Sequence, residues 1–107
     1  MRSFIRAAGW CVLLAAAGCP KNDEPPAVTR GRQTYNSQCT ACHNANPSQP
    51  GAVGPEVKGA TRDLIEAKLV HGKYPTGYAP KRSTALMPQQ PQLAGSIDDL
   101  AAFLTAP

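Results

Sequence analysis

The sequence lacks any run in which apolar and polar residues alternate, the pattern that a half-buried β-strand requires. This absence excludes a β-sheet and leaves helices and loops. With 9 glycines and 11 prolines, 20 of the 107 residues favour turns, and such a share predicts loops between short helices. A chain of this length has room for one small domain. We therefore predict an all-α domain of three to four short helices.

A strong excess of positive charge is also missing. The formal net charge is +4, but Arg2 and Arg6 lie in a segment that we expect to be removed, which leaves nine positive residues against seven negative ones. A domain that binds nucleic acid favours a concentrated basic stripe, and no nucleic-acid-binding motif is visible. We therefore exclude nucleic acid as a partner.

Histidine and methionine are scarce, with two of each. One of the histidines, His43, directly follows Cys39-Thr40-Ala41-Cys42 and completes the C-x-x-C-H motif for attachment of c-type haem. The two thiols add to the vinyl groups of the porphyrin as thioethers, and the adjacent imidazole reaches the iron. A small domain with little apolar burial also gains stability from such a covalent link. The motif predicts one covalently bound haem c.

Two other interpretations of Cys39 and Cys42 compete with haem attachment. The cysteines form a thioredoxin-like redox pair only in a βαβ context, which the sequence does not contain. They form half of a zinc site only if other ligands complete it, and His43 and His71 are the only histidines. His43 is poorly placed to share one ion with its neighbour Cys42.

Residues 1–18 have the features of a secretory signal peptide. Arg2 and Arg6 form its positive end, and residues 10–17 form an apolar stretch that is too short to span a bilayer comfortably. Cys11 lies within this stretch and is removed with it. An uncleaved anchor is the alternative.

The segment Leu14-Ala15-Ala16-Ala17-Gly18-Cys19 resembles the end of a bacterial lipoprotein signal, although Ala16 stands where leucine is preferred. The resemblance implies that Cys19 carries a lipid and becomes the first mature residue, on the periplasmic side of a membrane. Ordinary cleavage, with Cys19 left as a free thiol, is the alternative. Residues 19–29 are polar and proline-rich, so we predict an extended tether before a domain formed by residues 30–107.

Three helices are expected in this domain. The first runs from about Arg30 to Cys39. The second begins after Thr61, a suitable N-cap residue, and ends at Gly72. The third begins at Ser96, with Asp99 as the partner in a capping box and one face formed by the apolar residues that follow.

Residues 30–107 resemble the class I monohaem cytochromes c. The resemblance covers the domain and rests on Gly31-x-x-x-Tyr35, the C-x-x-C-H motif, Gly54-Pro55, Met87-Pro88 and Phe103, in this order. It implies that the first and last helices cross, with Gly31 accommodating Phe103. It also implies that the carbonyl group of Pro55 accepts a hydrogen bond from His43.

Met87 is the predicted second ligand of the iron, opposite His43. The only other methionine is Met1, and Met87 precedes a proline in a loop, as the resemblance implies. Methionine sulfur in this position raises the reduction potential. His71 and an open coordination site are the alternatives.

We predict a monomeric one-electron carrier that serves redox partner proteins and is not an enzyme, because no ionisable residues form a catalytic pair. One loop has a positive charge from Lys73, Lys81 and Arg82. This charge either attracts a partner protein with an acidic docking surface or simply faces solvent. The alternative function is a haem-based ligand sensor or a small peroxidase-like protein with an open or labile site. His71 is the only acid–base group available for the latter.

Overall fold

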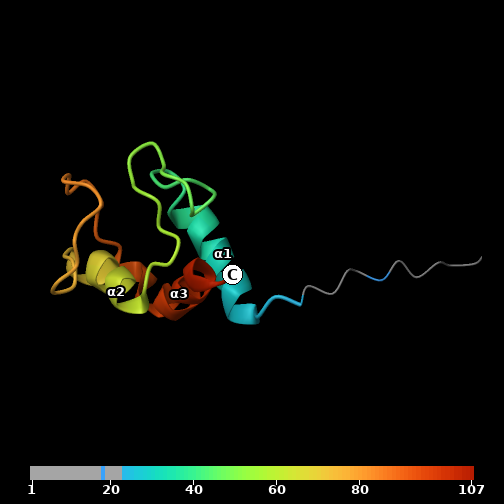
Figure 1. Cartoon of the computed structure of the whole chain (residues 1–107). Helices are drawn as coiled ribbons and strands as arrows, with labels where there is room; N and C mark the ends of the chain where they lie inside the picture. Colours follow the sequence, from blue (N-terminus) through green and yellow to red (C-terminus); the bar gives the residue numbers. More distant parts are fainter. Residues whose placement is uncertain (1–17, 19–22) are drawn as a thin grey trace, which may run out of the picture.

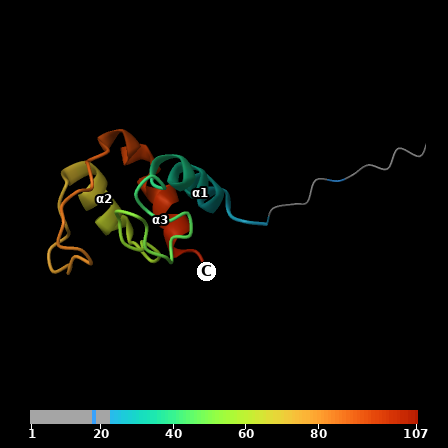
Figure 2. The same cartoon turned by 90° about the horizontal axis from the view of Figure 1, so that it is seen from above.

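The computed structural model describes Gly18 and residues 23–107. It contains α1 (Pro26–Gln38), α2 (Arg62–His71), the short 3-10 helix η1 (Pro91–Ser96) and α3 (Ile97–Thr105). The described residues form no strand, so the prediction of an all-α fold is confirmed. In both Figure 1 and Figure 2, α3 lies between α1 and α2. None of these helices is long and apolar enough to cross a membrane.

The crossing of α1 and α3 depends on Gly31. A Cβ atom at this position would lie 2.8 Å from the Cβ atom of Phe103 and closer still to the carbonyl group of Asp99. Only a residue without a side chain allows the two backbones to approach so closely. The predicted contact of Gly31 with Phe103 is therefore confirmed.

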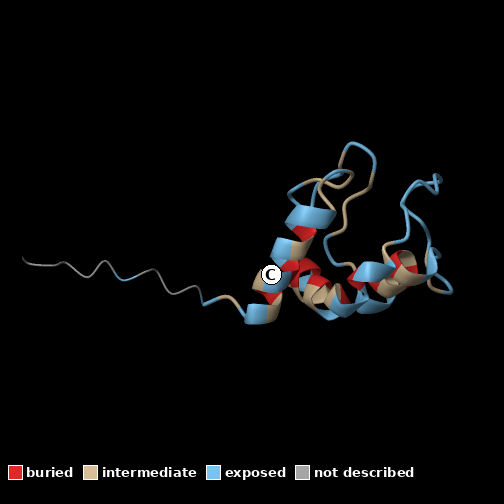
Figure 3. Ribbon diagram, turned by 180° about the vertical axis from the view of Figure 1, so that it is seen from behind, coloured by how far each residue is buried: buried red, intermediate tan, exposed pale blue. Residues whose placement is uncertain are grey.

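The core fills the space between the three helices, where Figure 3 shows buried segments facing one another. Tyr35 is the most completely buried large residue, and its ring centroid lies 5.5 Å from that of Phe103 at an angle of 53°. Such a tilted pair stabilises the crossing beyond its buried area. The other core residues are apolar: Val28, Ile65, Leu69, Leu93, Ile97, Leu100 and Leu104.

The first helix begins four residues earlier than predicted, at Pro26 instead of Arg30. Proline is tolerated in the first turn of a helix, where its missing N–H group has no partner in any case. The early start buries Val28 in the core. The prediction of an extended tether through Thr29 is therefore wrong for residues 26–29. Residues 19–22 lie outside the described part of the chain.

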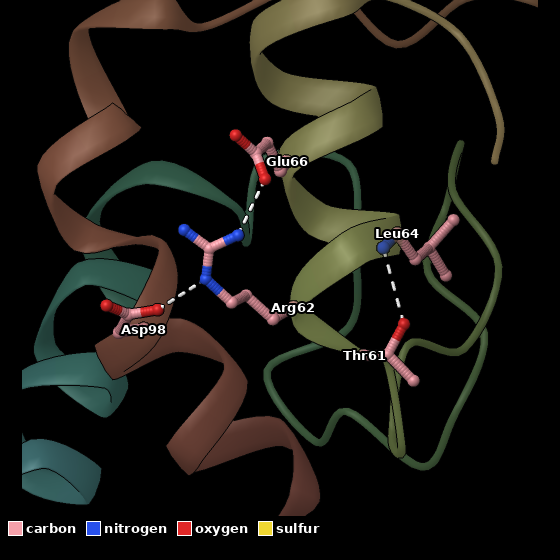
Figure 4. Close-up of polar contacts among 5 residues, drawn as sticks. All are labelled: Thr61, Arg62, Leu64, Glu66 and Asp98. Carbon is pink, nitrogen blue, oxygen red and sulfur yellow. Dashed lines mark hydrogen bonds and ion pairs between the residues drawn. The ribbon is translucent and has the colours of Figure 1, made fainter.

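The second helix has both of its predicted ends. The hydroxyl oxygen of Thr61 accepts a hydrogen bond from the Leu64 N–H group at 3.3 Å (Figure 4), and Gly72 ends the helix with φ 62°. Glycine adopts this left-handed conformation without a steric penalty. The caps therefore determine the length of the helix.

Arg62 connects α2 to α3. Its guanidinium group bonds Asp98 of α3 at 2.7 Å and Glu66 of its own helix at 2.6 Å (Figure 4). These side chains are partly exposed to solvent, so water and salt weaken each ion pair. The pair with Asp98 joins α2 to α3, whereas the pair with Glu66 lies within α2.

The predicted capping box at the third helix is wrong. Ser96 makes no capping hydrogen bond with its side chain, because η1 runs directly into α3 and gives Ser96 a φ of −106° and a ψ of 1°. Asp99 instead accepts two hydrogen bonds of 2.9 Å from Arg30. These bonds hold the pKa of Asp99 below its usual value and connect α3 to α1 beside Gly31.

Candidate functional site

The C-x-x-C-H motif forms a tight turn directly after α1. The N–H group of Cys39 donates to the carbonyl oxygen of Tyr35 at 2.9 Å and so ends the helix. The carbonyl oxygen of Cys39 in turn accepts hydrogen bonds from the N–H groups of Cys42 at 3.3 Å and His43 at 2.9 Å. The turn therefore brings all three predicted attachment residues to one end of α1.

The imidazole of His43 is held by the loop that follows the motif. Its Nδ1 atom lies 2.8 Å from the carbonyl oxygen of Pro55. Because a carbonyl oxygen only accepts hydrogen bonds, Nδ1 carries a proton, and in the neutral ring the lone pair is therefore on Nε2. This is the tautomer that a metal ligand requires at Nε2.

Gly54 lies against the face of this imidazole. A Cβ atom at Gly54 would lie 2.6 Å from Nδ1 and 2.9 Å from Nε2 of His43. In the sequence, Gly54 is notable only as part of the dipeptide with Pro55, and this contact was not predicted. The sequence contains no local signal for it, because the two residues meet only when the loop folds back.

Gly51 is a second glycine that sequence reasoning missed. A Cβ atom there would lie 2.6 Å from the Cα atom of His43 and 2.7 Å from the backbone nitrogen of Asn44. The same loop donates two hydrogen bonds to the carbonyl oxygen of Cys42, from Val53 at 3.2 Å and from Gly54 at 2.9 Å. No local signal marks Gly51 either, because this contact also forms only when the loop folds back.

A cavity of about 650 Å³ adjoins the motif. Its lining comes from the end of α1, the motif, the loop of residues 53–61, α2, α3 and the loop of residues 74–90. These two loops project to the same side of the helices in Figure 1. The volume is typical of a cofactor site. The apolar lining includes Val57, Leu64, Ile65, Leu69, Leu100 and Leu104.

The donor set of the cavity fits the predicted haem. Cys39, Cys42 and His43 lie on its lining, and so does Met87, which is 36% exposed. His71, the alternative ligand, is exposed on α2 and does not line the cavity. Thioether-forming cysteines, one imidazole and an apolar enclosure are what a covalently attached haem needs.

The alternative interpretations of the motif find no support in the structure. No group of three His, Cys, Asp or Glu side chains suited to a metal ion occurs among the described residues. Burial raises the pKa of the Cys39 thiol, whereas the attacking thiol of a redox pair has a lowered pKa. Cys19, the predicted lipidation site, lies outside the described part of the chain.

Tyr35 connects α1 to the loop after the motif. Its hydroxyl group donates a hydrogen bond of 2.6 Å to the carbonyl oxygen of Asn44, the neighbour of His43. Burial raises the pKa of Tyr35 to about 12, and a thiolate at Cys39 adds to this effect when no thioether is present. The phenol therefore stays protonated at neutral pH.

We expect Tyr35 to make the stability of the haem-loaded protein depend on pH above 10. Burial keeps the folded pKa above the ordinary value of 10.0, although below about 12 because a thioether at Cys39 carries no charge, so this contribution is complete below pH 10 and is lost as the pH rises through the folded pKa. The loss amounts to about 1–2 kcal/mol. Denaturant unfolding from pH 9 to 12 should show a smaller decline in Tyr35→Phe, and parallel curves for the two proteins would contradict the assignment.

The helix crossing at Gly31 and the attachment turn at the end of α1 are features of one class of protein, the class I monohaem cytochromes c. Comparison with family models identifies one family within this class. The model of cytochrome c oxidase, cbb3-type, subunit III, matches residues 26–104, which include all the described helices except the last residue of α3, and the chain belongs to this family. No curated protein matches the sequence. The resemblance in the sequence is thereby confirmed, and the cofactor is a covalently bound c-type haem.

Proposed function

We propose that this haem-based electron carrier is tethered to the periplasmic side of a bacterial membrane and holds its iron between His43 and Met87. The bound haem supplies one-electron chemistry, with the iron alternating between the ferrous and ferric states. The observation that carries the proposal is that His43 and Met87 line the same cavity, while the Nδ1 atom of His43 is hydrogen-bonded to the carbonyl oxygen of Pro55. The Nε2 atom is thereby available to the iron.

The protein side chains orient His43 and give the haem apolar surroundings. Pro55 and Gly54 fix the orientation of His43, and apolar residues of α2 and α3 line the cavity. Ligands that stay in place in both oxidation states minimise rearrangement during electron transfer. The site has the properties of a carrier, and we assign the chain no enzymatic activity.

The partners are redox proteins. The matched family is named after an oxidase subunit, which supports an oxidase as the first partner to test. Lys73, Lys81 and Arg82 belong to the loop beside the cavity and favour a partner with an acidic surface, which would associate faster at low salt. The sequence before the domain supports a lipid tether at Cys19, and the mass of the mature N-terminal peptide tests it.

We expect Met87→Ala to lower the reduction potential by about 0.1 V or more, because methionine ligation raises it. The reduced variant should also bind carbon monoxide rapidly and stoichiometrically at neutral pH, whereas the natural protein should not. A redox-titrated absorbance spectrum with and without carbon monoxide measures both effects.

Ala85→Ser is the matched control, since Ala85 is an exposed residue two positions before Met87 on the same loop and does not line the cavity. It should keep the potential and the spectrum of the natural protein. Rapid binding of carbon monoxide to the natural protein would overturn the assignment of Met87 and favour a ligand sensor. Peroxide turnover that His71→Ala abolishes would instead favour a peroxidase.

A further inference from the structure

Two loops on the rim of the cavity are connected by charged side chains. The Nζ atom of Lys81 lies 3.0 Å from the carbonyl oxygen of Glu56 and 3.3 Å from its Oε1 atom. The Nη2 atom of Arg82 lies 3.5 Å from the carbonyl oxygen of Gly54, at the limit of a hydrogen bond. Glu56 and Gly54 flank Pro55, which holds His43. The contacts therefore join the loop of Met87 to the loop that orients His43.

The loop of Met87 has few other attachments. Residues 81–89 are all exposed, and residues 83–89 make no hydrogen bond or ion pair within the described part of the chain. The next attachment is the N–H group of Gln90, which donates to the carbonyl oxygen of Leu69 at 2.8 Å. Met87 thus lies between two fixed points, Lys81 and Gln90.

We propose that Lys81 and Glu56 form a latch that holds Met87 in position for the iron. The inference rests on the proposed ligation by Met87, and both residues act through it as positioning residues. Their side chains are 40% and 44% exposed, so dissolved salt screens the ion pair. When Lys81 contacts Glu56 the latch is closed and methionine ligation is favoured. When these contacts are broken the latch is open, and the coordination site is free for an added ligand.

The two residues contribute unequally. Lys81→Met removes both contacts with Glu56, whereas Glu56→Gln removes the charge but keeps the carbonyl oxygen that accepts from Lys81. The lysine variant should therefore open the latch further than the glutamine variant. Arg82 adds little, because its contact is long.

Imidazole titration of the full-length, haem-loaded ferric protein tests the latch, with loss of the weak absorbance band of methionine-ligated ferric haem as the readout. The apparent affinity for imidazole is proportional to the fraction of protein with a free coordination site. At low ionic strength we expect about fivefold tighter binding for Lys81→Met and about twofold for Glu56→Gln. High salt should tighten binding to the natural protein and have less effect on either variant.

Lys73→Met is the matched control. It removes the same charge from the same loop, and Lys73 makes no hydrogen bond or ion pair with residues 54–56. It should bind imidazole like the natural protein, and Lys81→Arg should largely restore natural behaviour. Glu56→Gln preserves side-chain size, so it tests the latch even if Lys81→Met folds poorly.

The outcomes separate the latch from the ligand on which it acts. If Met87→Ala leaves the band unchanged, the ligation itself is wrong. If Met87→Ala abolishes the band but Lys81→Met and Glu56→Gln bind imidazole like the natural protein at both salt concentrations, the latch is wrong. An equal effect of Lys73→Met and Lys81→Met would assign the change to net charge and would also overturn the latch.

Discussion

Gly31→Ala is expected to lower the free energy of unfolding by about 2–3 kcal/mol. The added Cβ atom would lie 2.6 Å from the carbonyl carbon of Asp99, a backbone atom that moves only if α3 moves. Overpacking of this kind costs about 1–3 kcal/mol and occasionally more, and the severity of the contact with backbone favours a cost of about 3–4 kcal/mol. The greater helix propensity of alanine offsets up to about 1 kcal/mol of this loss.

The melting temperature of the haem-loaded variant measures this effect. A loss of 2–3 kcal/mol corresponds to a decrease of about 10–20 °C for a domain of this size. Gly95→Ala is the control, because a Cβ atom at Gly95 has no neighbour within 4 Å. It should change the free energy of unfolding by no more than about 0.5 kcal/mol. Equal melting temperatures for the two variants would show that the helix crossing tolerates a side chain.

Gly54→Ala should weaken the attachment of His43 to the iron by about 10–100-fold, the usual cost of disturbing a residue that orients a metal ligand. The new methyl group would occupy the space of the imidazole, which would have to rotate away from the carbonyl group of Pro55. Haem should still be attached, because the thioethers form at the cysteines.

The denaturant concentration at which the low-spin haem spectrum is lost measures the change. A 10–100-fold weakening of the bond between His43 and the iron corresponds to a loss of about 1.4–2.8 kcal/mol in binding free energy, and the denaturant concentration should fall accordingly. Ala52→Ser, an exposed substitution in the same loop, is the control and should keep the natural midpoint. A low-spin spectrum of unchanged stability in Gly54→Ala would show that the loop adjusts and that Gly54 does not hold the imidazole in place.

The parts of the fold that depend on neighbouring residues could be predicted from the sequence. Thr61 and Gly72 cap their helix by contacts within a few positions, and the attachment motif is contiguous. The start of α1 was missed because the prolines before it are equally typical of a linker. Whether Pro26 begins a helix depends on the burial of Val28 against distant segments.

Contacts between distant positions could not be predicted. Asp99 suits a capping box by its spacing from Ser96, but in the folded chain it pairs with Arg30, which is 69 positions away. Lys81 and Glu56 are 25 positions apart, and no periodicity connects them. The contact between Gly54 and His43 depends on how a loop folds back. Such contacts depend on the complete fold, which a single sequence without related sequences does not reveal.

Because α1 begins at Pro26, its full length separates the start of the domain from the attachment cysteines. Its 13 residues, at about 1.5 Å each, extend for about 20 Å from Pro26 to the turn that begins at Cys39. Anything joined to the chain before Pro26 therefore enters the domain one helix length away from the attachment cysteines. A tether joined there therefore attaches to the domain at the opposite end of α1 from the turn that holds the haem.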